Sequence, residues 1–403
     1  MFARAAAVLL LFAFHGAIPA EAEDAVILPF ANVTSAGALP PSHFDWIGES
    51  IAETLRDALG TRGVTVHASR ETGETFRRLN LKIGGLLTQA SALKVGERLD
   101  AEQVVFGTFE FVPTTAPADS MPQGTLKITA RVLDRRRLRQ SPEFTETGNL
   151  DDLTALEAHL AWRTLTLVAP KLAPPEAEFR TLGLHVRLDA QENYIRGLLA
   201  RTPEQQEKLF LQAARLDARF AHPVLQLGRM YLERKEYRKA AEWLQKIPET
   251  DSHSGEISFL LGLALLNSGD AIGAEKALQR VARLVPLSEV WNNLGAAQSR
   301  QDLPQAVESF RKALEGDPND PVYHFNLGYA QWKKGDFTTA ADRFRAVLDR
   351  QPDDQMATLL LGVCLKKQTP RQSDARLQGI ERLKTNYEEH AYLQLKSIVE
   401  PER

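Results

Sequence analysis

Apolar residues in the first 170 positions switch between the spacing of strands and the spacing of helices. Residues 25–30 form a short continuous apolar run, which predicts a buried strand that ends at Pro29. Further strands are expected at 63–67, 103–112, 124–133 and 142–147. A stripe of apolar residues at every fourth position predicts a helix that Gly60 ends: Ile47, Ile51, Leu55 and Leu59. With further helices at 83–99 and 153–168, residues 23–170 are expected to form an α/β domain with a mixed sheet.

From residue 190 onward the pattern has a much longer period. A Leu-Gly pair recurs at 227–228, 261–262, 294–295, 327–328 and 361–362, so successive glycines are 34, 33, 33 and 34 residues apart. A register this regular predicts a repeated helical hairpin, in which the missing side chain lets one helix approach the next closely. The second part of the chain is therefore predicted to be an all-α solenoid.

The two best-formed copies occupy residues 288–354. The first contains Trp291, Leu294, Gly295, Ala306, Phe310, Ala313 and Pro318. The second contains Tyr323, Leu327, Gly328, Ala340, Phe344, Val347 and Pro352. This pattern resembles the tetratricopeptide repeat (TPR). We expect residues 190–403 to form about six such hairpins plus a capping helix within residues 374–398, with an irregular first and last repeat.

The N-terminal segment resembles the TolB amino-terminal domain and its relatives of the curli-secretion CsgG type. The matching stretches are 27–32, 47–51, 95–101, 104–108 and 131–134. The resemblance implies an extracytoplasmic protein-interaction domain without catalytic residues. Paired prolines at 174–175 predict that residues 171–189 link this domain to the repeats.

Residues 1–22 have the features of a secretory signal peptide. Arg4 precedes an apolar run at 5–18, and small residues follow at suitable cleavage spacing. The run is short for a membrane span, and no cysteine near the cleavage point could carry a lipid. We therefore expect export to the periplasm or another extracytoplasmic compartment, with no transmembrane anchor in the mature chain.

Neither the composition nor any sequence motif indicates an enzyme. The net charge of −3 gives no general attraction to nucleic acid, and a single cysteine, Cys364, excludes an intrachain disulfide or a cysteine-based metal cluster. The nine histidines lack metal-ligand spacing, and no serine-hydrolase, Walker A or dinucleotide motif is present. We expect no catalytic residues, no cofactor and no metal.

The TPR resemblance also implies which residues would line the concave face of the solenoid. Counting from each glycine, the partner-binding groove is predicted at Phe259, Leu263, Leu266, Asn292, Phe325, Tyr329, Trp332 and Leu359. Tyr329 and Trp332 would be the aromatic anchors of a bound helix or extended peptide. The alternative is that the chain's own capping helices or α/β domain cover this face. An acidic C-terminal tail is a poor ligand, because the required lysines and arginines are absent from the third to fifth repeats.

These observations predict an exported, non-enzymatic adaptor or scaffold of the cell envelope that binds a protein or peptide, and not nucleic acid, through an apolar concave groove. A different class of function also fits: a regulatory protein whose α/β domain binds a small molecule or glycan and whose repeats relay the signal. A polar pocket within residues 24–170 would favour that second class. A hydrolase site in the α/β domain would instead require a nucleophile and base in contact.

Overall fold

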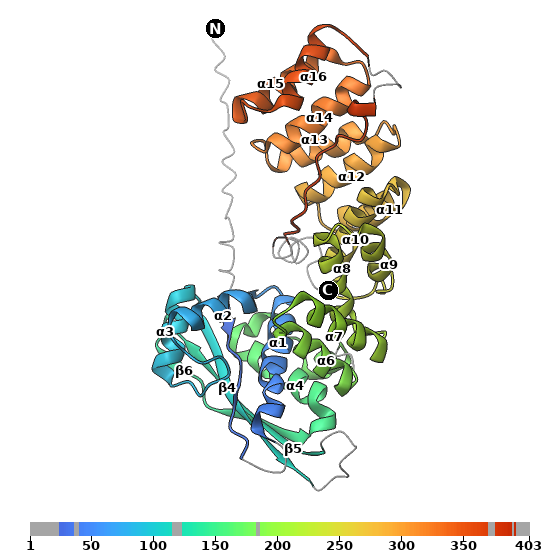
Figure 1. Ribbon diagram of the computed structural model, residues 1–403. Helices are drawn as coiled ribbons and strands as arrows, with labels where there is room; N and C mark the ends of the chain where they lie inside the picture. Colours follow the sequence, from blue (N-terminus) through green and yellow to red (C-terminus); the bar gives the residue numbers. More distant parts are fainter. Residues whose placement is uncertain are drawn as a thin grey trace, which may run out of the picture.

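The computed structural model describes residues 24–35, 40–114, 123–182, 186–369, 375–388 and 391. It has an N-terminal domain with a mixed sheet, followed by a stack of helices in a solenoid (Figure 1). This is the multidomain α/β and all-α architecture expected from the sequence. The expected signal peptide at 1–22 lies outside the described residues.

The sheet has seven strands in the order β3-β1-β4-β5-β6, with β2 also pairing with β4 and β7 with β5. Parallel pairing joins β1 to β3 and β4, whereas β4 and β5 form a long antiparallel ladder from Gln103–Asp134 to Pro113–Gly124. The strands are β1 (Asp24–Ile27), β2 (Ala31–Asn32), β3 (Thr65–Val66), β4 (Gln103–Pro113), β5 (Gly124–Asp134), β6 (Arg139–Gln140) and β7 (Phe144–Asn149).

Helices cover both faces of this sheet, which explains the continuous apolar run at its first strand. Ala25 and Ile27 pack in the core beneath α1 (Trp46–Gly60) and α4 (Leu153–Val168). Val26 and Leu28 pack on the opposite face with residues of α2 (Ser69–Arg78) and α3 (Gln89–Leu99). Alternate residues of a strand point to opposite faces, so a strand buried on both faces is apolar throughout. The sequence prediction lacked α2, and its helix at 83–99 begins only at Gln89.

The helices after the α/β domain stack as antiparallel hairpins. The pairs are α6–α7, α8–α9, α10–α11, α12–α13 and α14–α15. Their bounds, with the helices that flank them, are α5 (Glu176–Leu182), α6 (Leu188–Leu199), α7 (Pro203–Leu216), α8 (Ala221–Glu233), α9 (Tyr237–Leu244), α10 (Ser254–Ser268), α11 (Ala271–Leu284), α12 (Ser288–Arg300), α13 (Ala306–Gly316), α14 (Pro321–Lys333), α15 (Phe337–Arg350) and α16 (Gln355–Leu365). Helix α5 lies within the range expected to be a linker.

The repeated glycines lie where the two helices of a hairpin cross. A Cβ atom on Gly295 would come within 2.7 Å of Phe310, and one on Gly262 within 2.5 Å of Leu278. Such distances are far below van der Waals contact, so these positions require glycine. Gly362 of α16 has open space at the same position, because no second helix follows α16 in the described chain.

The prediction of a capping helix within residues 374–398 is wrong for residues 378–388. Residues 375–377 form one 3-10 turn, η4 (Ala375–Leu377), and residues 378–388 then run extended along the repeats. In Figure 1 this stretch, in dark red, descends from α14 past α12 toward α10. Its backbone groups bond to side chains of the solenoid, and these bonds replace those of a helix. We call residues 377–388 the C-terminal segment.

Candidate functional site

The residues predicted to line a groove lie on four helices, α10, α12, α14 and α16. Most of them are buried, with exposed fractions of 3% or less. These are Phe259, Leu263, Leu266, Asn292, Phe325, Tyr329 and Trp332. Leu359 is different, because its side chain is 51% exposed. The C-terminal segment contacts several of these residues and contributes to their burial.

Three asparagines hold the backbone of the C-terminal segment. Asn326 of α14 accepts a hydrogen bond from the Arg382 amide at 2.8 Å and donates to the Arg382 carbonyl at 2.7 Å. Asn293 of α12 makes the same pair of bonds with Lys384, at 2.9 and 2.7 Å. Asn292 donates to the Arg382 carbonyl at 2.9 Å. Contacts to alternate residues suit an extended peptide, and backbone contacts of this kind do not depend on the peptide's sequence.

Acidic side chains of the solenoid bind the two basic residues of the segment. Arg382 forms two hydrogen bonds to the carboxylate of Asp354, at 2.6 and 2.8 Å, and its guanidinium lies 3.6 Å from the centre of the Phe325 ring. Lys384 pairs with Asp320 and lies over the ring of Tyr323. Burial alone raises the pKa of Asp354, but the hydrogen bond and charge of Arg382 act together with backbone hydrogen bonds from Ala357 and Met356, and their sum lowers that pKa. Each basic side chain is thus held between a carboxylate and an aromatic ring, and we call the two pairs, Asp354 with Phe325 and Asp320 with Tyr323, the acidic seats.

Apolar side chains of the segment complete the contact. Leu377 and Ile380 pack on the cluster around Phe325 and Trp332, and Leu383 and Tyr387 pack nearer the start of the stack. The ring of Tyr387 lies 5.1 Å from that of Phe259, centre to centre. The segment therefore runs antiparallel to the order of the repeats.

The two predicted aromatic anchors bind backbone carbonyls of this last part of the chain. The hydroxyl of Tyr329 donates to the Leu377 carbonyl at 2.6 Å, and the indole N–H of Trp332 donates to the Gln368 carbonyl at 2.8 Å. Sequence reasoning missed Asn293 and Asn326. A signal existed, since each stands two residues before the repeat glycine in successive repeats.

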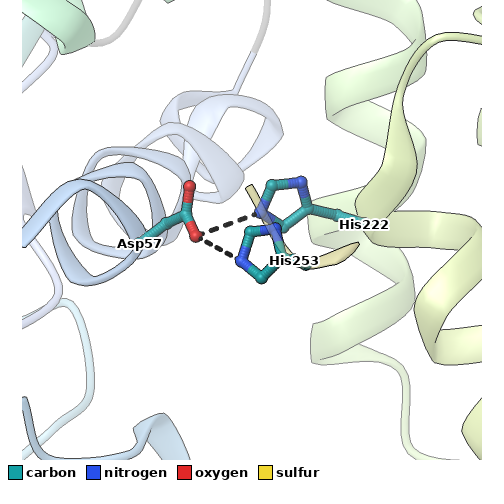
Figure 2. A group of neighbouring side chains, drawn as sticks. All are labelled: Asp57, His222 and His253. Atoms are coloured by element: carbon teal, nitrogen blue, oxygen red, sulfur yellow. Dashed lines mark ion pairs between the residues drawn. The ribbon is translucent and has the colours of Figure 1, made fainter. Parts of the chain in front are cut away.

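A second cluster joins the α/β domain to the repeats. In Figure 2, His222 of α8 and His253, just before α10, face the carboxylate of Asp57 on α1. The Nε2 atoms of His253 and His222 lie 2.9 and 3.5 Å from the same oxygen of Asp57. Asp251 lies on the other side of His253, 3.3 Å from its Nδ1.

The ligand atoms of Asp57, His222 and His253 lie within 4.8 Å of one another and could share a metal ion. The distances favour a direct ion pair. A zinc ion at about 2.0–2.1 Å from two ligands would hold them roughly 3.3 Å apart, which is more than the separation of Asp57 and His253. Burial lowers the pKa of His253, but hydrogen bonds to Asp251 and Asp57 outweigh it and raise the pKa to about 11. We therefore interpret the cluster as a charged imidazolium held by two carboxylates across the domain junction.

Replacing Asp57 by asparagine should destabilise this junction. Breaking a buried ion pair costs about 3–5 kcal/mol. Because Asp57 is 31% exposed and Asp251 still holds His253, we expect a loss of about 2 kcal/mol. Asp57 contributes to the free energy of unfolding above its unfolded pKa of about 3.9. The contribution of His253 is complete below its unfolded pKa of about 6.5 and is lost as the pH rises above that value. Urea unfolding should thus show the largest loss between roughly pH 4 and 6.5, declining toward pH 11, whereas exposed Asp151→Asn should change little. An equal loss in both variants would contradict the interpretation.

A further group of polar side chains at the junction forms hydrogen bonds within the group. Glu157 of α4 accepts hydrogen bonds from Thr54 at 2.9 Å and Gln191 of α6 at 2.6 Å, and Gln191 also donates to Ser50 at 2.7 Å. Desolvation raises the pKa of Glu157 to about 7, although these hydrogen bonds act in the opposite direction. These converging polar side chains bind one another, so they do not supply the open polar pocket that the ligand-sensing alternative needs.

Two family models match the chain, described as "TPR repeat" over residues 298–335 and "Tetratricopeptide repeat" over 325–388. The chain is similar to Superkiller complex protein 3 of Mus musculus, with 28% identity over 189 residues, 44% of this chain and 12% of that protein. It is also similar to the BBSome complex member BBS4 homolog of Drosophila melanogaster, with 26% identity over 149 residues, 36% of this chain and 30% of that protein. The chain thus matches well under half the length of these relatives.

Solved structures also resemble the repeats. YrrB, described as a TPR protein with an unusual peptide-binding site, is 22% identical over 42% of this chain and 91% of its own, with a TM-score of 0.38. MamA of Desulfovibrio magneticus RS-1 is 24% identical over 41% of this chain and 95% of its own, with a TM-score of 0.37.

The two family-model matches show that the chain contains tetratricopeptide repeats. Such repeats are generally non-catalytic modules that bind proteins or peptides, so the class of protein is an interaction scaffold. Among the described helices, none is both long and apolar enough to cross a lipid bilayer.

Proposed function

We propose that this protein is an exported adaptor of the cell envelope that captures an extended segment of a partner protein in the concave groove of its repeats. Until a partner arrives, the C-terminal segment occupies that groove as an internal ligand. The N-terminal domain, by its resemblance to the TolB amino-terminal domain, would add a second protein contact. The signal-peptide pattern at 1–22 supports the extracytoplasmic setting.

The observation that carries this proposal is the paired contact of Asn293 and Asn326 with a peptide backbone. Both amides are fully buried, and buried amides require partners. An extended chain supplies one N–H and one C=O at alternate residues, which matches what each amide needs. A partner segment can replace the C-terminal segment without any change to these bonds.

An internal ligand sets a threshold for partner binding. A tethered segment acts at an effective concentration on the order of millimolar, so a free partner peptide must outcompete it. Release of the segment should therefore strengthen partner capture. The variant Arg382→Glu with Lys384→Glu would bring like charges against Asp354 and Asp320 and so favour release.

Photo-crosslinking in the native cell envelope tests the proposal. A crosslinking amino acid at Leu359, which is exposed on α16, should capture a defined protein, and capture should increase in the Arg382→Glu, Lys384→Glu chain. Leu138, 71% exposed on the β5–β6 turn, is the matched position on the α/β domain. Capture only from Leu138 would assign recognition to the α/β domain. Export is tested by N-terminal sequencing of the chain from the periplasmic fraction, where residues 1–22 should be missing.

A further inference from the structure

We infer that the groove selects extended peptides that carry two basic residues in the pattern basic–x–basic. This inference rests on the proposed function and names the chemistry of its partner. The pattern is that of Arg382 and Lys384, whose backbones the asparagines hold and whose side chains enter acidic seats. The ligand class is a cationic, extended segment of a protein.

The two acidic seats are a repeated feature of the solenoid. Asp320 and Asp354 stand at the N-terminal caps of α14 and α16, the first helices of successive repeats. Each accepts a hydrogen bond from a backbone amide of its own helix, at 2.7 Å from Val322 and 3.0 Å from Ala357. Each uses its remaining carboxylate capacity to hold a basic residue of the segment. Two carboxylates fixed by the fold in this way determine the spacing of the charges that they can bind.

The aromatic rings of these seats strengthen the selection. Arg382 lies over Phe325 at 3.6 Å, and Lys384 lies over Tyr323 at 4.9 Å from the ring centre. A cation between a carboxylate and the face of a ring interacts favourably with both. The carboxylates of Asp354 and Asp320 are only 9% and 15% exposed, so a neutral or acidic side chain there would leave a poorly hydrated charge without a partner.

The apolar contacts define the rest of the ligand. Leu383, between the two basic positions in sequence, is partly buried and packs against the core, and Ile380 and Tyr387 pack on either side. Glu381 forms an ion pair with Arg300 at 3.3 Å. The groove should therefore also favour an acidic residue directly before the first basic residue of the ligand. A suitable partner segment therefore has an apolar residue between its two basic residues.

Fluorescence anisotropy with the full-length chain tests this inference. The probe is a labelled peptide with the sequence of residues 377–391, and the receptor is the full chain with Arg382→Glu and Lys384→Glu, which is expected to release the segment from the groove. We expect this peptide to bind at least about tenfold more tightly than a peptide with glutamine at both basic positions. The preference should weaken at high salt, because the pairs are partly exposed.

Charge-neutral caps provide the matched receptor variants. Asn also caps helices well, so Asp320→Asn with Asp354→Asn retains both helix caps and removes both charges. When these two substitutions are added to the receptor with Arg382→Glu and Lys384→Glu, the basic peptide and the glutamine peptide should bind about equally. Asp336→Asn is the control, since Asp336 caps α15 through the Thr339 amide. It should leave the preference unchanged.

The outcomes separate the inference from the proposed function. If the basic and the glutamine peptides bind equally, the groove takes extended peptides but does not select charge, and the inference is wrong. If hydrogen exchange shows that the charge-reversed segment stays in the groove, the acidic seats contribute nothing and the inference is again wrong. If the vacated groove binds neither peptide, the proposed function itself fails.

Discussion

Replacing Trp332 by alanine is expected to destabilise the C-terminal repeats by about 3–5 kcal/mol. The indole is 1% exposed and packs beside Tyr329 in the cluster that joins α14, α15 and α16. Removing a buried tryptophan costs the transfer energy of its atoms and leaves a cavity that the neighbours fill only in part. The hydrogen bond from the indole to the Gln368 carbonyl is lost as well. Urea unfolding and hydrogen exchange of α14–α16 would measure the effect.

Two further substitutions serve as comparisons: one removes the hydrogen bond of Trp332, and the other removes a tryptophan that is half-buried. Trp332→Phe keeps most of the packing and loses the N–H donor. The lost hydrogen bond should lower the free energy of unfolding by about 1 kcal/mol, in addition to the loss from the smaller ring. Trp291 of α12 is half-buried with Lys312 over its ring at 4.1 Å, and Trp291→Ala should cost roughly 1 kcal/mol. If Trp332→Ala were no worse than Trp291→Ala, Trp332 would not be part of the core.

This expectation replaces the one that the sequence suggests. With Tyr329 and Trp332 taken as exposed anchors, a double alanine substitution should leave folding intact and abolish partner capture. Both side chains are buried and bond to the chain's own carbonyls, so the substitution would damage the fold as well as the groove. Loss of capture in that variant would therefore not identify a binding site. Asn293→Ala, with Asn267→Ala as control, is the better choice, because Asn267 bonds only within its own helix in the described contacts.

The solenoid was predictable because its physical requirements recur along the chain. Gly262, Gly295 and Gly328 each lie at a close helix crossing, and a requirement repeated every 33 or 34 residues appears directly in the sequence. The continuous run 25–28 was equally informative, since only a strand covered on both faces is apolar at every position. Helix α2 has few buried residues, namely Thr72, Thr75 and Phe76, and gave no apolar stripe.

The conformation of the C-terminal segment was not predictable from its own residues. Leu377, Ile380, Leu383 and Tyr387 are spaced by three, three and four positions, which is the spacing of a helix. The segment is extended because Asn293 and Asn326, more than fifty residues away in sequence, supply the backbone bonds that a helix would otherwise make. Tertiary contacts override local pattern here. The junction cluster was missed for a related reason, since Asp57, His222 and His253 meet only after the two domains dock.

One buried carboxyl group, that of Glu157, is expected to weaken the junction as the pH rises from 5 to 8, in addition to the declining contribution of His253. Glu157 is fully buried, and desolvation raises its pKa from an ordinary 4.5 to about 7. Between these two values the folded protein binds a proton that the unfolded chain has released, so the stability falls as the pH rises. Above about pH 7 both states are ionised and the full penalty remains. A pKa difference of this size corresponds to about 3 kcal/mol.

Glu157→Gln should remove this pH dependence, because glutamine resembles the protonated acid in shape and carries no charge. Its side-chain oxygen can still accept the bonds from Thr54 and Gln191, and its amide takes the place of Oε1, which has no hydrogen-bond partner in the described chain. At pH 5 the variant and the natural chain should thus be about equally stable. At pH 8 the variant should be more stable by about 3 kcal/mol in urea unfolding. Exposed Glu97→Gln on α3 is the control and should give the same difference at both pH values. A constant difference for Glu157→Gln as well would mean that Glu157 is already charged at pH 5, and that its bonds with Thr54 and Gln191 outweigh its desolvation.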